Sequence, residues 1–218
     1  MSVVNNPSGG SSKVMRVYYP QGSYKPSASP RGGAQFFKRL STPRELATLT
    51  YDIYFAKNFN FVKGGKLPGM YGGTKTCSGG RDSSDCFSTR FMFRRDGDGE
   101  VYLYAPDNQV SNFCSDSKVI CNYHSGHSLG RGTFRFRTGR WYTISQRVKL
   151  NTVGQTNGYV KVLINGSQVY YKSNLRLRNS SSVKIDGMFF STFFGGSDSS
   201  WATPVNTYTY FRNFKMTT

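Results

Sequence analysis

The chain has 218 residues, and its 29 Lys and Arg against 11 Asp and Glu give a formal net charge of +18. This length is enough for one domain with a sizeable core, and the charge attracts anionic partners: nucleic acid, an anionic membrane or an acidic polysaccharide. The sequence has no run of about 18 apolar residues, so we expect no membrane-spanning segment.

The first residues, MSVVNNPSGGSSK, are rich in Ser, Gly and Asn and lack the basic start and apolar stretch of a signal peptide. We expect residues 1–15 to be a flexible linker or tail and residues 16–218 to be a single domain. This organisation fits a domain that belongs to a longer protein.

Short alternating segments separated by turn residues dominate after about residue 34. Segments with the alternation of β-strands are 48–62, 87–95, 101–105, 133–138, 141–150, 159–165, 167–172, 184–194 and 207–216. Asn165-Gly166 predicts a two-residue hairpin turn. Only residues 42–50 suit a short helix, with Thr42 as its N-cap. Many strands without interleaved helices predict an all-β jelly-roll β-sandwich of two antiparallel sheets.

One predicted hairpin combines residues 87–95 with residues 100–105 across the turn RDGDG. Its Phe, Val and Leu side chains share the face that must be buried. Ser88, Arg90, Tyr102 and Tyr104 therefore share the outer face. The alternative is an ordinary solvated sheet face on which Arg packs against Tyr.

If Arg94 lies opposite Glu100, Arg90 lies opposite Tyr104. A slip of one residue would bury the arginines, so the register is well specified.

The segment FVKGGKLPGMYGG (61–73) predicts a basic loop with glycines before and after Lys66. Glycine lets the backbone approach a ligand closely and leaves the ammonium group unhindered. The alternative is a solvated turn.

Three motifs, VKGGKLPG, Ser88-x-Arg90 and Tyr102-x-Tyr104, together resemble family 14 polysaccharide lyases, including the alginate or polyglucuronate lyases of Chlorella viruses. The resemblance runs from about residue 34 to FRNFKM near the C-terminus and includes FFGGSDSSWATP (193–204). It implies a jelly roll with a concave substrate cleft and cleavage of 1,4-linked uronate chains by β-elimination, without metal or other cofactor. The catalytic residues that it implies are Lys66, Ser88, Arg90, Tyr102 and Tyr104.

The chemistry of elimination explains these residue types. Removing the C5 proton of a uronate next to its carboxylate requires that the carboxylate charge be neutralised, which Arg90 and Lys66 can do. Ser88 can donate a further hydrogen bond to the same group. A tyrosine then takes the C5 proton and donates one to the leaving O4, because a nearby cation lowers the pKa of a phenol.

Further basic residues are expected to bind successive uronates along the groove. Candidates for substrate binding are Lys63, Arg135, Arg137, Arg147 and Lys149, with His124 on the cleft rim. The alternative for the arginines and Lys149 is a solvated basic face.

The four cysteines are Cys77, Cys86, Cys114 and Cys121, and they allow three pairings. Their separations match no common zinc pattern, and the chain has only two His. We predict the disulfides Cys77–Cys86 and Cys114–Cys121, which would place the working protein outside a reducing cytosol. The alternative is four reduced thiols.

Other chemistries fit the sequence less well. A glycoside hydrolase needs two carboxyl groups beside the scissile bond, and the chain has only two Glu, Glu45 and Glu100. RDGDGE (95–100) lacks the full twelve-residue pattern of a calcium loop, and His124 and His127 lack a convincing third ligand. We therefore expect no metal.

Three functions remain: a lyase, a non-catalytic jelly-roll lectin for acidic glycans, and a single-strand nucleic-acid binder. The third is disfavoured because the aromatic residues alternate as core residues rather than cluster as a stacking platform. For the lyase we expect a cell-wall uronate polymer as the partner, without nucleic acid or membrane. We also expect a monomer that is extracellular or virion-associated.

Overall fold

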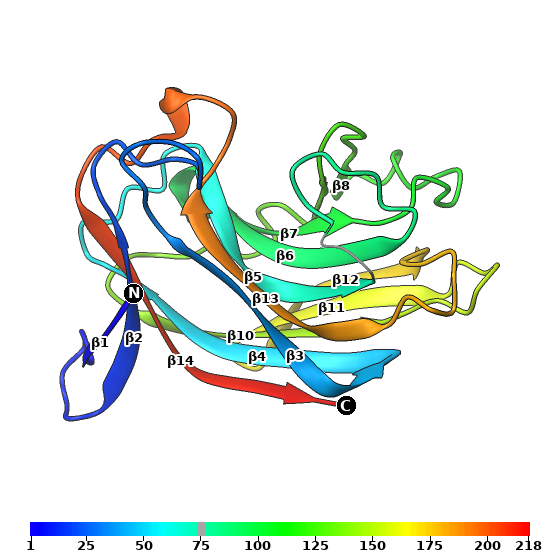
Figure 1. Cartoon of the computed structure of the whole chain (residues 1–218), viewed down its shortest axis with the longest axis horizontal. Coiled ribbons are helices and arrows are strands. Elements are labelled where there is room, and N and C mark those ends of the chain that lie inside the picture. The colour runs from blue at the N-terminus through cyan, green and yellow to red at the C-terminus, as the bar shows by residue number, and fades with distance from the viewer. Residues whose placement is uncertain (74–76) are drawn as a thin grey trace.

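The structure, a computed structural model, describes residues 1–73 and 77–218. Two antiparallel β-sheets of seven strands each pack against one another (Figure 1). One sheet, here the outer sheet, has the strand order β1-β2-β14-β4-β10-β11-β12. The other, here the cleft sheet, has the order β3-β13-β5-β6-β7-β9-β8. The predicted all-β jelly-roll sandwich is confirmed.

The strands of the outer sheet are β1 (Ser2–Asn5), β2 (Lys13–Tyr19), β14 (Thr207–Thr217), β4 (Leu46–Phe55), β10 (Trp141–Lys149), β11 (Gly158–Ile164) and β12 (Ser167–Leu175). The strands of the cleft sheet are β3 (Ala34–Arg44), β13 (Ile185–Phe194), β5 (Gly64–Gly73), β6 (Cys86–Arg94), β7 (Gly99–Tyr104), β9 (His127–Leu129) and β8 (Val119–Ile120). Two short 3-10 turns, η1 (Arg95–Gly97) and η2 (Ser199–Trp201), are the helical elements of the described residues. In the part of the chain that the structure describes, no helix is long and apolar enough to cross a membrane.

The hairpin predicted at Asn165-Gly166 is confirmed. The two residues connect β11 to β12 with positive φ values of 51° and 83°, as a tight hairpin turn of this type requires.

The helix predicted for residues 42–50 is wrong. Strand β3 continues to Arg44 and β4 begins at Leu46. Ala47 and Leu49 are both buried at alternate positions, so the segment follows the two-residue period of a strand. Its pairing with β10 and β14 outweighs the weak local preference for a helix.

The expected linker at residues 1–15 is instead largely a hairpin. β1 pairs with the first residues of β2, and β2 pairs with β14 at the edge of the outer sheet. Val14 and Val17 are buried, so this hairpin contributes side chains to the core.

Aromatic rings fill the space between the two sheets. Phe59 contacts Phe55 of β4, Phe93 of β6 and Phe194 of β13, with ring centroids 4.9, 5.3 and 5.1 Å apart. Phe55, Phe93 and Phe194 have no exposed surface. This cluster joins the two sheets and supports the strands that carry the cleft.

Replacing Phe55 with alanine should lower the free energy of unfolding by about 3–5 kcal/mol, because the lost ring leaves a cavity in the core. The matched control is Phe37→Ala, since the Phe37 side chain is 44% exposed and should lose far less stability. Chemical denaturation followed by circular dichroism measures both variants. Equal losses would contradict this assignment of the core.

The β6–β7 hairpin has a register that differs from the predicted one by two residues. Arg90 lies opposite Tyr102, and Ser88 lies opposite Tyr104. The difference arises at the turn, where the Arg94 N–H donates to the Asp98 carbonyl at 2.7 Å before the strands pair. A shift of two residues keeps every side chain on its face, so the predicted outer set stays together.

The segment predicted as a basic loop is the strand β5, which lies between β13 and β6. A Cβ at Gly65 would lie 2.3 Å from the Phe93 ring, and one at Gly69 would lie 2.2 Å from the Thr89 carbonyl oxygen. These glycines therefore allow the neighbouring strand β6 to pack closely against β5, and they do not make room for a ligand. Lys66 pairs with Met92 and lies on the same face of the sheet as Arg90.

Candidate active site

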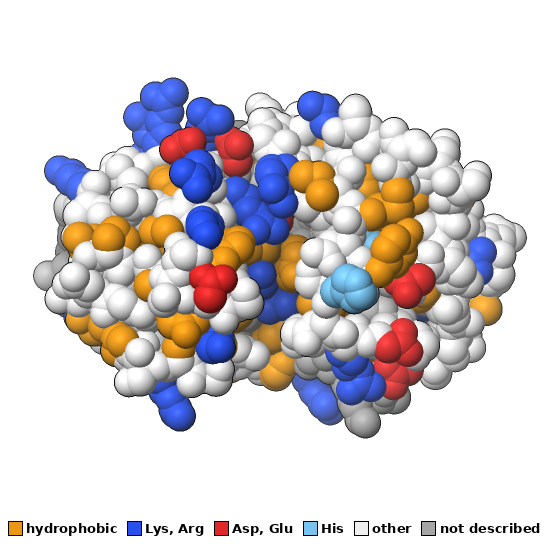
Figure 2. Space-filling model, turned by 90° about the horizontal axis from the view of Figure 1, so that it is seen from above, with side chains coloured by type: hydrophobic (Ala, Val, Ile, Leu, Met, Phe, Trp, Pro, Cys, Tyr) orange, Lys and Arg blue, Asp and Glu red, His pale blue; other side chains and the backbone are white. Residues whose placement is uncertain are grey.

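A cavity of about 940 Å³ lies on the cleft sheet and is bounded by the loops around it. Figure 2 shows a hollow between two lobes, with Lys and Arg side chains inside it. The cavity is lined by Lys25, Pro26, Gln35, Lys66, Ser78, Gly79, Gly80, Arg90, Arg94, Tyr102, Tyr104, Ile120, Asn122, His124, Ser125, Gly126, Ser128, Arg131, Phe193, Gly195, Gly196, Ser197 and Trp201. Four of the five predicted catalytic residues are among them.

Lys66 of β5 and Arg90 of β6 form the cationic floor of the cavity. The Lys66 ammonium lies 4.0 Å from the centre of the Tyr102 ring and 3.1 Å from the Met92 sulfur. The Arg90 guanidinium lies over the Phe189 ring at 4.6 Å and donates to the Ser191 hydroxyl at 3.2 Å. Arg90 is only 2% exposed, so its remaining donors face the cavity or the protein interior.

Neither cation has an acidic partner among the ion pairs of residues 1–73 and 77–218. The Arg90 Nε atom is buried without a hydrogen-bond partner in the same residues. Burial and the charges of Arg90 and Arg94 hold the pKa of Lys66 well below its usual range, while Glu100 acts in the opposite direction. Burial also lowers the pKa of Arg90 to about 10. A desolvated, unpaired cation is costly unless an anion joins it.

A buried carboxylate holds two further arginines at the cavity wall. Glu100 of β7 has no exposed surface and pairs with Arg94 at 2.6 Å and with Arg131 at 2.7 Å. The Ser128 hydroxyl also donates to it. Although burial raises the pKa of Glu100, the two arginines hold that pKa below its usual range. Glu100 therefore stays ionised and fixes both guanidinium groups.

Tyr102 and Tyr104 of β7 lie side by side, with ring centroids 5.5 Å apart. The Tyr102 hydroxyl accepts the Gly126 N–H at 3.0 Å, and the Tyr104 hydroxyl accepts the Gly80 N–H at 2.9 Å. Burial raises the pKa of Tyr104 to about 12, and the electrostatic effect of the neighbouring Tyr102 is the second cause of this increase. The expected lowering by a nearby cation does occur at Tyr104, but burial outweighs it.

Ser88 does not line the cavity. It is fully buried, and its hydroxyl donates to the Cys77 carbonyl at 2.7 Å. This contact replaces the hydrogen bond to a substrate carboxylate that the sequence led us to expect.

The structure separates several predicted substrate-binding residues from the cavity. Arg147 and Lys149 lie on β10 of the outer sheet, which corrects their assignment to the groove. Arg135 pairs with Asp98 at 2.7 Å, and Arg137 is exposed beyond the cavity lining.

Lys63 lies next to the cavity rather than in its wall. Its ammonium group binds the Ser200 hydroxyl at 2.6 Å and lies 6.0 Å from the Trp201 ring, which lines the cavity. His124 lines the cavity directly, as predicted for a rim residue.

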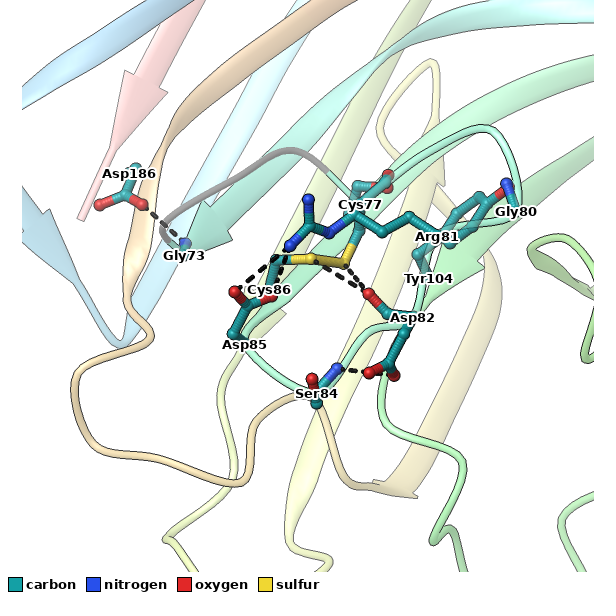
Figure 3. Close-up of a disulfide and its surroundings, with 11 residues drawn as sticks. Gly73, Cys77, Gly80, Arg81, Asp82, Ser84, Asp85, Cys86, Tyr104 and Asp186 are labelled. Carbon is teal, nitrogen blue, oxygen red and sulfur yellow. Dashed lines mark hydrogen bonds and ion pairs between the residues drawn. A yellow bond between two sulfur atoms is a disulfide. The ribbon is translucent and has the colours of Figure 1, made fainter.

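Both predicted disulfides are confirmed: Cys77 is bonded to Cys86, and Cys114 to Cys121. Figure 3 shows the first bridge closing the loop that passes beside Tyr104. Both sulfur atoms of this bridge lie within 4.0 Å of the Asp82 carbonyl oxygen.

Sequence reasoning missed Arg94, Arg131 and Trp201 as cavity residues. Arg94 could have been predicted from the alternation of β6, which places its side chain on the same face as Arg90. Arg131 and Trp201 come from loops whose course depends on the whole fold. No group of three or more His, Cys, Asp or Glu suitable for a metal occurs in the described residues.

Together the fold and the site define an all-β sandwich with a cationic, tyrosine-containing groove on one sheet. The family Polysaccharide lyase 14 matches residues 7–214, so the chain belongs to polysaccharide lyase family 14.

Individual relatives agree with this family. The marine PL-14 alginate lyase from Aplysia kurodai is 45% identical, with a TM-score of 0.92 over 100% of this chain and 87% of its own. The alginate lyase from Chlorella virus is 24% identical, with a TM-score of 0.81 over 99% of this chain and 87% of its own, and shows the same fold. Exolysin of Paramecium bursaria Chlorella virus 1 is 28% identical over 213 residues, which cover 85% of this chain. The chain spans about a third of that curated relative, 32% of its length.

Proposed function

We propose that this protein is a polysaccharide lyase that cleaves 1,4-linked uronate chains such as alginate or polyglucuronate by β-elimination. The observation that carries the proposal is the pair of cations Lys66, half-buried, and Arg90, buried, beside two tyrosines in a large cavity. Within the described residues neither cation has an acidic partner in an ion pair. The resemblance to the Aplysia alginate lyase, at 45% identity, supports a uronate polymer as the substrate.

Arg90 is proposed to neutralise the carboxylate of the uronate that loses its C5 proton. A guanidinium group binds a carboxylate through two parallel hydrogen bonds, and it does so most strongly where water is excluded. Burial of Arg90 has already removed much of its hydration. The substrate carboxylate then supplies the missing counter-charge, and the carbanion-like transition state gains more from it than the ground state does.

Lys66 is proposed as the base that takes the C5 proton. Its lowered pKa increases the fraction of neutral amine at any given pH, and a general base must be neutral to accept a proton. This role differs from the charge-neutralising role that we expected from the sequence. Tyr104 is a poor base because its pKa lies near 12.

Tyr104 is proposed instead to donate a proton to the leaving O4. The electron pair of the C5–H bond becomes the C4–C5 double bond, and the pair of the C4–O4 bond leaves with O4. O4 then takes the proton of the Tyr104 hydroxyl. Lys66 ends protonated and Tyr104 ends as a phenolate, and proton exchange with solvent restores both. Tyr102, in contact with Lys66, positions the base.

Successive uronates along the chain need further cations. Arg94 and Arg131, held by Glu100, face the same cavity and are proposed to bind neighbouring carboxylates. His124 and Trp201 extend the wall of the groove. Their spread along the cavity favours a polymer over a single sugar.

The proposed place of action is outside the cell or on a virion, against an acidic cell-wall polysaccharide. Two disulfides support an oxidising environment.

The test is to mix the protein separately with alginate, polyglucuronate and single-stranded DNA and to follow the ultraviolet absorbance of an unsaturated uronate. Growth of this absorbance with either uronate polymer supports the proposal. Binding of a polymer without any growth would indicate a lectin, and retention of DNA alone would indicate a nucleic-acid binder.

Chelation by EDTA should leave the rate of elimination unchanged, within about twofold, because cationic side chains supply the positive charge that a metal would otherwise supply. The measurement compares initial rates before and after dialysis against EDTA. Loss of activity that calcium restores would mean that the acidic turn at residues 95–100 binds a required ion.

A further inference from the structure

Both cavity tyrosines have their hydroxyl oxygen bound by a glycine N–H of a rim loop. Gly80, in the loop closed by the Cys77–Cys86 bridge, donates to Tyr104 at 2.9 Å. Gly126, in the loop that follows Cys121, donates to Tyr102 at 3.0 Å. Two separate loops thus make the same contact with two neighbouring tyrosines, which indicates that the contact affects the phenol groups.

A backbone N–H on the oxygen of a phenol affects proton donation in two ways. It occupies an acceptor position, so the O–H proton is directed away from the loop and toward another acceptor. It also stabilises the phenolate that remains after the proton has gone, and the Gly80 contact does lower the pKa of Tyr104 against the larger effect of burial. The contact thus makes Tyr104 a better oriented and stronger acid.

The loop that carries Gly80 is fastened to β6 at two points. The Cys77–Cys86 bridge joins it to the first residue of that strand. The buried Ser88 hydroxyl donates to the Cys77 carbonyl at 2.7 Å, which fixes the start of the loop on the next outer-face position. Figure 3 shows the bridge, Gly80 and Tyr104 in one group.

The second loop approaches too closely for any residue but glycine. A Cβ at Gly126 would lie 2.8 Å from the Tyr104 ring and 2.9 Å from the Tyr102 ring. Gly80 has a φ of +82°, and a Cβ there would lie 2.8 Å from the His124 carbonyl oxygen. The two rim loops therefore pack on the tyrosines and on each other.

We propose that the loop between Cys77 and Cys86 is a positioning device for Tyr104, in which Ser88 and the disulfide hold the Gly80 N–H against the phenol oxygen. This inference rests on the proposed function, since it assigns Tyr104 the proton-donating role. It gives Ser88 and the bridge an indirect part in catalysis, through a backbone amide.

The test is a double-mutant cycle with kcat and KM measured on a uronate polymer. Tyr104→Phe should lower kcat by about 10²–10³-fold, as loss of a general acid does. Ser88→Ala, and separately Cys77→Ser/Cys86→Ser, should each lower kcat by about tenfold through one lost hydrogen bond, with little change in KM. Combined with Tyr104→Phe, neither change should lower kcat further, because the residue through which it acts is already disabled.

The comparison variant is Cys114→Ser/Cys121→Ser, which removes the bridge beside the second rim loop, with a sequence separation of seven rather than nine residues, and leaves the Cys77–Cys86 bridge and the Ser88 contact in place. Any loss that it causes should persist in the Tyr104→Phe background. Thermal unfolding shows whether each variant is folded at the assay temperature. If the Ser88→Ala loss also persists undiminished in that background, or if kcat is unchanged, the positioning role is overturned.

A readout independent of activity is hydrogen exchange of the Gly80 amide by NMR. Tyr104→Phe removes its acceptor and should speed exchange by about tenfold, and Ser88→Ala should also speed it. Unchanged exchange in both variants overturns the proposal even if the enzyme is active. Slow exchange of the Gly80 amide in a wild-type protein that cleaves no uronate, with faster exchange in both variants, would support the contact while refuting the proposed function.

Discussion

Replacing Arg90 with alanine should lower kcat on a uronate polymer by about 10²–10³-fold, with a smaller change in KM. In the proposed mechanism Arg90, which is 2% exposed, binds the substrate carboxylate as its counter-charge. The negative charge on the substrate carboxylate group grows as the C5 proton leaves, so the interaction is strongest in the transition state. Steady-state rates over a range of polymer concentrations separate the two constants.

Two further variants make this experiment specific. Arg90→Lys keeps a positive charge but loses the planar pair of donors, so it should recover only part of the lost rate. Arg147→Ala removes an arginine from β10 of the outer sheet and should leave kcat unchanged. Circular dichroism confirms that each variant is folded. A folded Arg90→Ala enzyme with near-normal kcat would remove Arg90 from the mechanism.

Much of the fold follows from alternation in the sequence. The Phe, Val and Leu positions of β6 and β7 are buried between the sheets, and the Arg and Tyr positions between them face the cavity. A period of two residues fixes these faces whatever the register, so the site residues could be grouped correctly although the predicted pairing was off by two. The disulfides were also predictable, because short separations bring cysteines together across a single turn or loop.

Glycine caused the largest error in reading the chain. The glycines of β5 indicate a flexible loop when taken alone, because glycine is unfavourable within a strand. In the structure they are needed because Phe93 and the β6 backbone lie where a side chain would be. That requirement comes from neighbouring strands, and one sequence segment does not reveal it.

Burial has the largest effect on the pKa values of the site residues Tyr104 and Lys66. From the sequence, a cation beside a tyrosine suggests an acidic phenol. In the folded cavity, desolvation is the larger effect at Tyr104 and raises its pKa to about 12, while it lowers the pKa of Lys66. We therefore propose that the base is Lys66 rather than a tyrosine, while a tyrosine keeps the role of acid that the sequence predicted.

Lys66→Ala should abolish detectable elimination, a loss of about 10³-fold or more, because the base is removed. Lys66→Arg separates the two roles that Lys66 could have. Arginine keeps the positive charge but stays protonated, so it can neutralise a carboxylate and cannot accept the C5 proton. We expect Lys66→Arg to be as inactive as Lys66→Ala, and substantial activity in Lys66→Arg would restore the charge-neutralising role.

The pH dependence of kcat tests the same proposal, that Lys66 is the base. Elimination needs neutral Lys66, so kcat should rise as pH increases through the lowered pKa of Lys66. It should fall only at strongly alkaline pH, where the proposed acid Tyr104, whose pKa burial raises to about 12, begins to lose its proton. Glu100 raises the pKa of Lys66, so Glu100→Gln should lower that pKa and move the rising limb to more acidic pH. A rising limb that stays in place in a folded Glu100→Gln variant, or moves to higher pH, would show that the group titrating there is not Lys66.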